Sequence, residues 1–487
     1  LGRQSSVGLD PRSFKRDSTL LNLLTSADDP EIRAQICRVI VDRRPQTSEE
    51  RKQLQEYRDK RKGVASNSSA DPDVTMDDPG FVETFFFPTA LVRHLLQDES
   101  PRVRSLAALA LRSFSPSATM PALLKMLDEN ETNDSVVRHS ASVALSRISE
   151  SLLVTQGLPE ASPAARMGIT LALRRQKSKE LARLLDDPEP LIVLEAARGI
   201  HDEEIIAALP QLAALADQPM PSGDDGLTDA LVRRVMNANF RLGQKEHAER
   251  VVKFATSASL SESLRVEALE ELKMWDAPSP LDRVLGAWRP IAEKRDAGFI
   301  ANLLRSQLGG IISGGESIQK LGAELAAKYG IQEVEPVLVA VVGDSTKADS
   351  SRVAAIKALD RLDSKAIAKL AEASLKDDSP DVRVAARQIS VRRNPDAAAT
   401  ILARAILDGT TVEQQAAIAQ LAELKRADAD AVLTEWLTVM VAGNAPTAIH
   451  LDLLEAAKAR GTGTLKKQVA TFEQALDPAD PLSKYRV

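Results

Sequence analysis

The sequence predicts an all-α solenoid, a superhelix of stacked antiparallel helix pairs. Aromatic residues are only 3% of the 487 residues while apolar residues are 44%, so Ala, Leu, Val and Ile must build the core. This composition favours close helix packing over an aromatic-rich β-sandwich. A short phrase also recurs, and its marker arginine returns after 34 residues from Arg104 to Arg138 and after 31 from Arg352 to Arg383. That interval is close to the length of one helix pair and indicates a repeat array.

The recurring phrase is an acidic turn followed by a proline and an arginine. One copy, DESPRVR, runs from Asp98 to Arg104, and another, DDSPDVR, runs from Asp377 to Arg383. The proline pre-sets φ at the first position of a helix, where its missing N–H is not needed. Apolar residues then follow at helical spacing, as in the turn and second helix of a HEAT-type hairpin. The repeat residues defined in this way are Pro30, Arg33, Pro101, Arg104, Arg138, Pro380 and Arg383.

The copies and their interruptions divide the chain into segments. We expect an N-terminal tether at 1–19, a HEAT-repeat array at 20–274 with a charged insertion at about 43–81, an irregular Trp/Pro/Gly-rich junction with helices at 275–345, a second HEAT-repeat array at 346–476, and a C-terminal linker at 477–487. The basic part of the insertion, 43–62, would suit an acidic partner, but a solvated helix face explains it without one. The four glycines of 308–317 predict a bend or loop.

Composition bounds the function. With 63 basic and 69 acidic residues the net charge is −6, so the broad positive surface of a nucleic-acid-binding solenoid is missing and we expect no nucleic acid partner. The single cysteine, Cys37, excludes an internal disulfide and a cysteine-rich zinc site, and we expect it to be a small buried thiol. No run of 18 apolar residues predicts a membrane span. The start at Leu1, without Met or a signal peptide, suggests a processed or excised product.

Residues that could carry catalysis do not converge in the sequence. No histidine has another within three or four positions, and the motifs HExxH and GxSxG are absent; the five histidines are His94, His139, His201, His247 and His450. The glycine-rich stretches 309–315 and 461–467 do not fit GxxxxGK[ST] and are predicted to be interhelical turns. We therefore predict no catalytic residues, no cofactor-binding residues and no metal ligands in this chain.

Acidic pairs occupy the repeat turns at Asp28/Asp29, Asp98/Glu99, Asp186/Asp187 and Asp377/Asp378. Such pairs can bind calcium or act as acid and base. One active site would not, however, place a pair at every turn, whereas capping of the following helix predicts this recurrence. We also expect the marker arginines to pair with turn acids of neighbouring repeats and so to form a ladder along the array.

Three features resemble one specific family. These are the HEAT phrases, the stretch WDAPSPLDRVLGAWRP at Trp275–Pro290, and the exit DPLSKY at Asp480–Tyr485, with Phe14-Lys15 in the tether. Together they resemble the HEAT-repeat middle region of the large multidomain proteins of planctomycete-type bacteria known as membrane-bound dehydrogenase or haem-binding CxxCH (cytochrome c) proteins. The resemblance implies an extracytoplasmic location, periplasmic or membrane-associated, a β-propeller dehydrogenase domain before the array and a c-type cytochrome after it. This sequence has no CxxCH, so haem c is expected only in a downstream domain or partner.

The leading functional hypothesis is a non-catalytic protein-interaction and spacer scaffold, part of such an extracytoplasmic redox assembly. One alternative is a free-standing cytoplasmic HEAT adaptor. The other is a helical-repeat enzyme with its site in the concave groove, and the acidic net charge and the scattered histidines count against it. The candidate partner-binding residues interrupt the array: Trp275, Arg283, Trp288 and Arg289. The competing interpretation, which we favour, is that the two tryptophans and their prolines only fill an irregular junction between two sub-arrays.

Overall fold

The structure is a computed structural model that describes residues 27–42, 89–112, 114, 116–131, 133–219 and 226–474. The predicted tether (1–19), insertion (43–81) and C-terminal linker (477–487) lie outside the described residues. Within the described ranges the regular structure is helical apart from one isolated β-bridge. The residues divide into two compact units, and the boundary falls after Ala238, inside the helix α14 (Gly226–Leu242).

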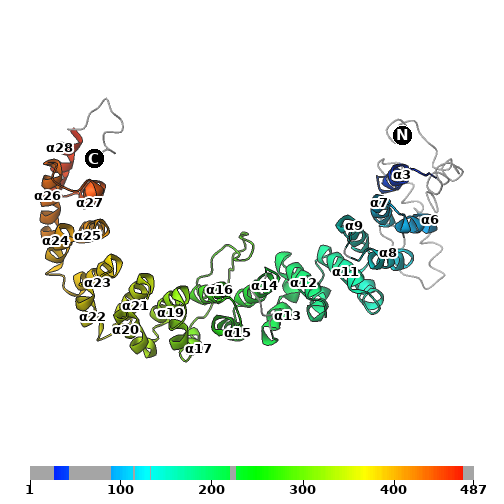
Figure 1. The fold of residues 1–487 in the computed structure, drawn as a ribbon, viewed down its shortest axis with the longest axis horizontal. Coiled ribbons are helices and arrows are strands. Elements are labelled where there is room, and N and C mark those ends of the chain that lie inside the picture. The colour runs from blue at the N-terminus through cyan, green and yellow to red at the C-terminus, as the bar shows by residue number, and fades with distance from the viewer. Residues whose placement is uncertain are drawn as a thin grey trace. The chain divides into compact units, whose positions relative to one another are not determined.

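The first unit stacks helices in two layers (Figure 1). One layer contains α3 (Pro30–Asp42), α7 (Pro101–Leu111), α9 (Ser135–Leu145), α11 (Pro163–Arg175) and α12 (Pro190–Asp202), each packed against the next. The other elements are α6 (Thr89–His94), η1 (Leu95–Gln97), α8 (Pro116–Asn130), α10 (Glu150–Leu152), η2 (Leu153–Gly157), η3 (Lys179–Asp186), η4 (Ile206–Ala208), α13 (Leu209–Ala214) and η5 (Leu215–Asp217). Of these, α6, α8 and η3 pack on α7, α9 and α12 respectively, as helix pairs require.

The second unit repeats the arrangement. One layer contains α16 (Glu262–Lys273), α19 (Glu316–Tyr329), α21 (Asp349–Arg361), α23 (Pro380–Arg393), α25 (Thr411–Glu423) and α27 (His450–Arg460), again packed in succession. Their pairing partners are α15 (Lys245–Thr256), α18 (Leu308–Ile312), α20 (Glu335–Gly343), α22 (Ile367–Ser374), α24 (Ala398–Asp408) and α26 (Ala427–Val441). The remaining elements are α17 (Ile300–Leu304), η6 (Gln332–Val334), η7 (Thr447–Ile449) and α28 (Gly463–Gln474). The predicted all-α HEAT-repeat solenoid is confirmed.

Prolines and capping hydroxyls start the second helix of several repeats. Proline occupies the first helical position of α7, α11, α12 and α23. Ser162 and Ser379 accept backbone N–H groups of the first turns of α11 and α23, which satisfies donors that have no partner inside the helix. Gly461, with φ +61°, ends α27 in the left-handed region. The interhelical turn is shorter than the predicted stretch 461–467, because α28 already begins at Gly463.

One sequence expectation about the middle of the chain differs from the structure. The glycine-rich stretch 308–317 is not wholly a bend, because its first half is the short helix α18, whose Leu308, Ile311 and Ile312 are buried. Burial of these side chains offsets the roughly 1 kcal/mol that each helical glycine costs relative to alanine. The helices expected within the junction of 275–345 begin at Ile300, and α19 packs on both α16 and α21, so stacking continues through this stretch.

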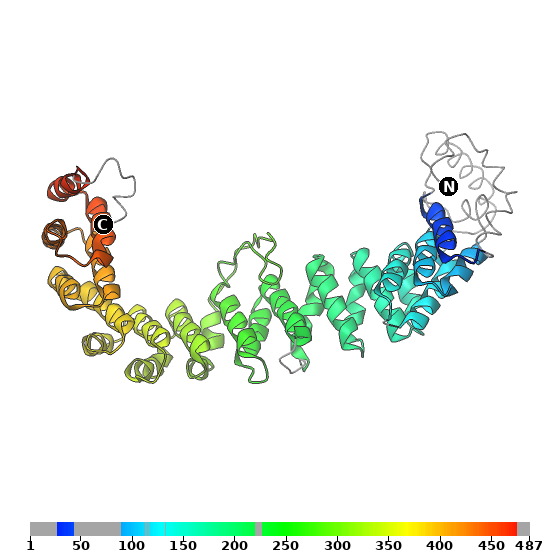
Figure 2. The ribbon, with the colours of Figure 1, turned by 45° about the horizontal axis from the view of Figure 1, so that its top comes forward.

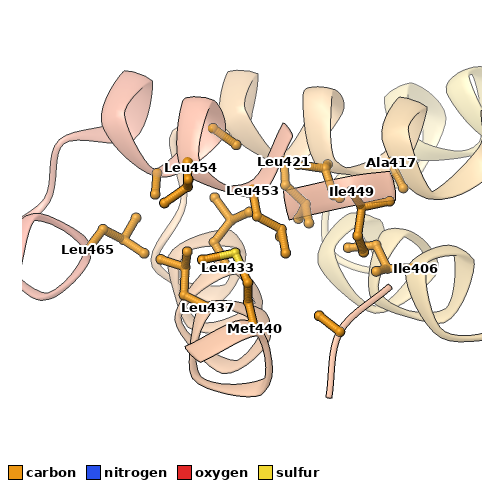
Figure 3. Close-up of a cluster of buried hydrophobic side chains, with 14 of the residues drawn as sticks. Ile406, Ala417, Leu421, Leu433, Leu437, Met440, Ile449, Leu453, Leu454 and Leu465 are labelled. Carbon is orange, nitrogen blue, oxygen red and sulfur yellow. The ribbon is translucent and has the colours of Figure 1, made fainter. Parts of the chain in front are cut away.

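The core at the end of the second unit shows how one repeat depends on the next (Figure 3). Leu433, Leu437 and Met440 of α26 point toward Leu453 of α27 and Leu465 of α28, and all five are buried. Small residues such as Ala417 and Ala457 are buried among the larger side chains of this cluster and let the helices approach closely. Each helix therefore buries its apolar face only against neighbouring helices, as in a one-dimensional array.

We expect Leu453→Ala to lower the local unfolding free energy by about 2–5 kcal/mol, because the side chain is fully buried and the substitution leaves a cavity. The matched control is Leu451→Ala, two residues away on the same helix, where the side chain is 59% exposed and the change should be within about 0.5 kcal/mol. Amide hydrogen exchange of α26–α28 measures both. Equal effects would contradict the described packing.

Candidate functional site

An arginine ladder links successive repeats. Arg33 of α3 donates from Nε and Nη2 to the two carboxylate oxygens of Asp98 at 2.7 and 2.9 Å, and from Nη1 to the carbonyl of Ala27 in its own turn. Arg104 then donates from Nη1 to the carbonyl of Asp98 at 2.8 Å. The turn at Asp98 is thus held through its side chain by the preceding repeat and through its backbone by its own. A bidentate, partly buried pair of this kind fixes both distance and orientation.

The same arrangement returns in the second unit. Arg352 of α21 pairs with both carboxylate oxygens of Asp377, while Arg383 of α23 donates to the carbonyls of Asp377 and Asp378. Arg383 also donates from Nε and Nη2 to Glu413 of α25 at 2.9 and 2.8 Å. Three consecutive helices of one layer are therefore joined by charge-assisted hydrogen bonds.

The ladder is not continuous through every marker arginine. In the first unit Arg166 pairs with Asp187, but among the described residues neither Arg104 nor Arg138 has a carboxylate partner. The three paired aspartates share one position in the repeat. Each of Asp98, Asp187 and Asp377 lies six residues before the marker position of its own phrase. The corresponding residue for Arg104 is Thr132, which carries no charge. The expectation that every marker arginine pairs with a turn acid therefore fails for Arg104 and Arg138.

The turn acids act as caps. Asp29, Asp98, Asp187 and Asp377 each accept the backbone N–H two residues ahead, at 2.8 to 3.0 Å. Burial raises the pKa of Asp377, but the hydrogen bonds from Arg352 and from the N–H of Ser379 outweigh it and leave that pKa below its ordinary value. Within the described ranges, no three His, Cys, Asp or Glu side chains are placed together to hold a metal ion.

The histidines and the cysteine are dispersed. His94 and His139 are exposed, His201 is buried between Asp202 and Asn237, and His247 accepts the N–H of Gln244 at the start of α15. His450 is buried on α27. Cys37 is the small buried thiol that the sequence predicts, and burial raises its pKa to about 12. These residues lie in separate parts of the array, where His201, His450 and Cys37 are buried and His247 caps the start of α15.

The stretch between α16 and α17 forms a hairpin that projects from the helices beside α16 (Figures 1 and 2). We call residues 279–290 the junction hairpin. Leu281 and Trp288 make an antiparallel β-bridge, closed by hydrogen bonds from Asp282 N to Ala287 O at 2.8 Å and from Arg289 N to Pro280 O at 2.9 Å. Gly286 completes the turn with φ +67°, a conformation that a residue with a Cβ rarely adopts.

Asp282 organises the junction hairpin from inside. Its side chain is fully buried and accepts the N–H groups of Val284 and Leu285, both at 2.9 Å. Arg241 of α14 and Arg289 lie 3.5 and 4.0 Å from the same carboxylate oxygen. A buried carboxylate needs such partners, so the turn conformation and the attachment to α14 depend on each other.

Arg283 fastens the outer side of the junction hairpin to α16. Its guanidinium pairs with Glu267 and Glu270 on that helix, with 3.0 Å between Nη2 and Glu267 Oε2. Burial lowers the pKa of Arg283, but the hydrogen bonds and charges of the two glutamates outweigh it and raise that pKa above its ordinary value. The junction hairpin is therefore anchored on two sides.

Trp275 fills the base below the junction hairpin. The ring is fully buried, in edge-on contact with Phe240 and Phe299 at centroid distances of 5.7 and 6.5 Å. The guanidinium of Arg295 lies 4.9 Å from the Phe240 ring centroid and 5.5 Å from that of Trp275. Burial, and then the charge of Arg241, lower the pKa of Arg295 to about 10. The base is thus a packed aromatic cluster closed by a cation.

The structure separates the four candidate partner-binding residues. Trp275 has no exposed surface, so its ring cannot contact a partner and we remove it from the candidates. Arg283 and Arg289 are mostly buried in the ion pairs that anchor the junction hairpin, so they position it. Trp288 is 72% exposed. Sequence reasoning missed Asp282, whose spacing of four residues from a left-handed glycine indicates this turn, and missed Arg241, which joins the site only through the fold.

No helix of the described residues is long and apolar enough to cross a membrane. A family model described as HEAT repeats matches residues 88–164. No curated protein matches the sequence.

Several solved structures are similar at low identity. A mutant of Kap121p has 13% identity and a TM-score of 0.47, with 97% of this chain and 51% of that chain covered. The Kap95:Nup1 complex has 12% identity and a TM-score of 0.40, with 98% and 69% covered. Human deoxyhypusine hydroxylase has 12% identity and a TM-score of 0.22, with 62% and 94% covered. This chain spans about half the length of the Kap121p chain. The stacked helix pairs and the HEAT match together identify the fold as a HEAT-repeat α-solenoid.

We expect Glu413→Gln to destabilise α23–α25 at neutral pH by about 1–3 kcal/mol, because the buried carboxylate accepts from Arg383, Arg387 and Thr410. The hydrogen bond from Arg383, ahead of the others, depresses the pKa of Glu413 far below its ordinary 4.5. The native state therefore binds fewer protons than the unfolded state, and the difference between the variant and the wild type should be complete above pH 4.5 and shrink as the pH falls toward the depressed value.

Urea unfolding between pH 7 and pH 3 measures this difference. Asp408→Asn, which removes the exposed partner of Arg404, is the matched control and should change little. A difference that stays constant across this range would show that the carboxylate charge is not what joins α23 to α25.

Proposed function

We propose that this chain is a non-catalytic protein-interaction scaffold that sets the spacing between the proteins it joins. The observation that carries the proposal is the arginine ladder. Bidentate pairs such as Arg383–Glu413 join one repeat to the next at a defined distance and orientation. A flexible tether needs no such joints, whereas a spacer does. The scattered positions of the histidines agree with a role without catalysis.

The spacing function can be measured inside the second unit. Glu372 on α22 and Leu451 on α27 are exposed and lie on either side of the joint between Arg383 and Glu413. Nitroxide labels on Glu372→Cys and Leu451→Cys should give one narrow distance distribution by pulsed electron paramagnetic resonance. The natural Cys37 stays unlabelled, because it is buried and its thiol pKa is raised.

Removing the joint with Arg383→Gln and Glu413→Gln together should broaden that distribution while the far-ultraviolet circular dichroism stays helical. Asp408→Asn should leave the distribution narrow. A distribution that is already broad in the labelled wild type would sink the spacer function.

We further propose that the scaffold belongs to an extracytoplasmic redox assembly. The support is the resemblance of Trp275–Pro290 and of the HEAT phrases to the dehydrogenase and cytochrome c proteins named above. In that setting the array separates a β-propeller dehydrogenase from a c-type cytochrome, and haem c belongs to the downstream domain or partner. A free-standing cytoplasmic HEAT adaptor and an enzyme with a site in a concave groove are the competing functions.

The gene around this segment tests the assembly. We expect propeller strands encoded upstream and a CxxCH motif downstream, and we expect the protein purified from its native source to show haem c absorbance. An ordinary start codon and stop codon at the two ends of the segment, with no haem in the purified protein, would favour the adaptor.

A further inference from the structure

We propose that the guanidinium of Arg104 binds a carboxylate side chain, Asp or Glu, of a protein partner. Arg104 lies in the first turn of α7, the helix that packs directly against α9. The inference rests on the proposed scaffold function, and it adds a contact residue and the chemical group that the partner must present.

The marker arginines use their nitrogens in one fixed way. Nη1 donates to backbone carbonyls of the arginine's own turn, while Nε and Nη2 form a fork that takes both oxygens of a carboxylate from the next repeat. The pairs that share this arrangement are Arg33–Asp98, Arg166–Asp187 and Arg383–Glu413. Because the bonds within the turn fix the side chain, the fork faces the next repeat in each case.

Arg104 is oriented in the same way. Its Nη1 donates to the carbonyls of Asp98 and Glu99 at 2.8 and 3.1 Å. Arg383 makes the same two bonds within its own turn at 2.6 and 2.9 Å. Among the described residues, however, the fork of Arg104 makes no hydrogen bond, and neither Nε nor Nη2 is a buried nitrogen. A group from another molecule can therefore reach both nitrogens.

The next repeat has kept its helix cap but not the acid of the ladder. The residue six positions before Arg138 is Thr132. Asp134 caps α9 instead, because its Oδ1 accepts the N–H groups two and three residues ahead at 2.7 and 3.1 Å. Elsewhere one aspartate performs both functions. For Arg138 the chain provides an acid at the equivalent position, Glu160, so the joint after Arg104 is where the sequence itself omits the carboxylate.

The paired repeats indicate which group the fork of Arg104 fits. A guanidinium fork matches carboxylates and phosphates alike. Beside their forks, however, the side chains of Asp98 and Asp187 are only 8% and 4% exposed, so the space between two repeats closely encloses a planar carboxylate. We expect the same space beside Arg104, because α7 and α9 pack as directly as the other helices of this layer. A fork that is already oriented loses little conformational entropy when the carboxylate binds.

The Nε–H signal of Arg104 in nuclear magnetic resonance spectra of the full chain tests the proposal, and its loss in Arg104→Lys assigns it. The probe is the peptide acetyl-DDPE-amide, which copies residues 186–189, where Asp187 pairs with Arg166. We expect this peptide to shift the signal, saturably, toward the position of paired Arg33. The control peptide acetyl-DNPE-amide, which carries an amide in place of the pairing carboxylate, should bind at least about tenfold more weakly.

Two variants separate the fork from general attraction of anions. Thr132→Asp restores an acid at the ladder position, so the signal of Arg104 should lie near that of Arg33 without peptide and should no longer respond to it. Arg102→Gln is the matched control, because it removes the same charge from the same helix at a side chain that is 60% exposed. It should change the affinity of the peptide by less than about twofold.

Several results would overturn the proposal. One is a signal of Arg104 that no peptide concentration moves, or one that already lies at the paired position because an acid of this chain occupies the fork. Another is a Thr132→Asp variant whose signal stays in place or still responds. Equal binding of the two peptides, an equal loss in Arg102→Gln, or tighter binding of inorganic phosphate would show general anion attraction. A narrow label-to-label distance in the second unit with any of these results would leave the spacer function standing and remove only this contact.

Discussion

The bidentate pairing of an arginine with a carboxylate of the next repeat is the interaction on which this structure depends. Helix stacking buries Ala, Leu and Val, and such contacts are not directional, so by themselves they permit sliding between repeats. The pairs Arg33–Asp98 and Arg352–Asp377 add direction, because a planar guanidinium meets a carboxylate in one geometry. The same carboxylates cap their own turns. One residue type thus fixes where a helix begins and how it meets its neighbour.

The junction hairpin uses the same chemistry for a different end. The buried carboxylate of Asp282 and the guanidinium of Arg283 again form ion pairs within a turn. Here the pairs hold an irregular segment against α14 and α16, and Trp288 remains exposed to solvent. Trp275, which is close to Trp288 in sequence, is fully buried and fills the base below the junction hairpin. The filler interpretation therefore holds for Trp275, and the contact interpretation of Trp288 stays a prediction.

Prediction from the sequence succeeded where the physics is local and repeated. The proline and acid of each phrase act within two or three residues, so the helix starts and caps could be derived without a fold. The glycines of 308–317 were misjudged because burial of Leu308 and Ile312 outweighs helix propensity, and burial is not a local quantity. The predicted pairing of marker arginines with turn acids of neighbouring repeats occurs at several repeats. It does not occur at Arg104, because the next phrase has Thr132 in place of an acid.

By itself the sequence determined the class of fold and the period of the array, because spacing and composition are properties of the chain alone. Only the tertiary structure decided which of Trp275 and Trp288 is buried, and that Arg241 and Asp282, 41 residues apart, meet in one buried pair. Such choices depend on which surfaces the stacked helices leave free. A sequence period carries no information about them, since the junction hairpin lies where the period is broken.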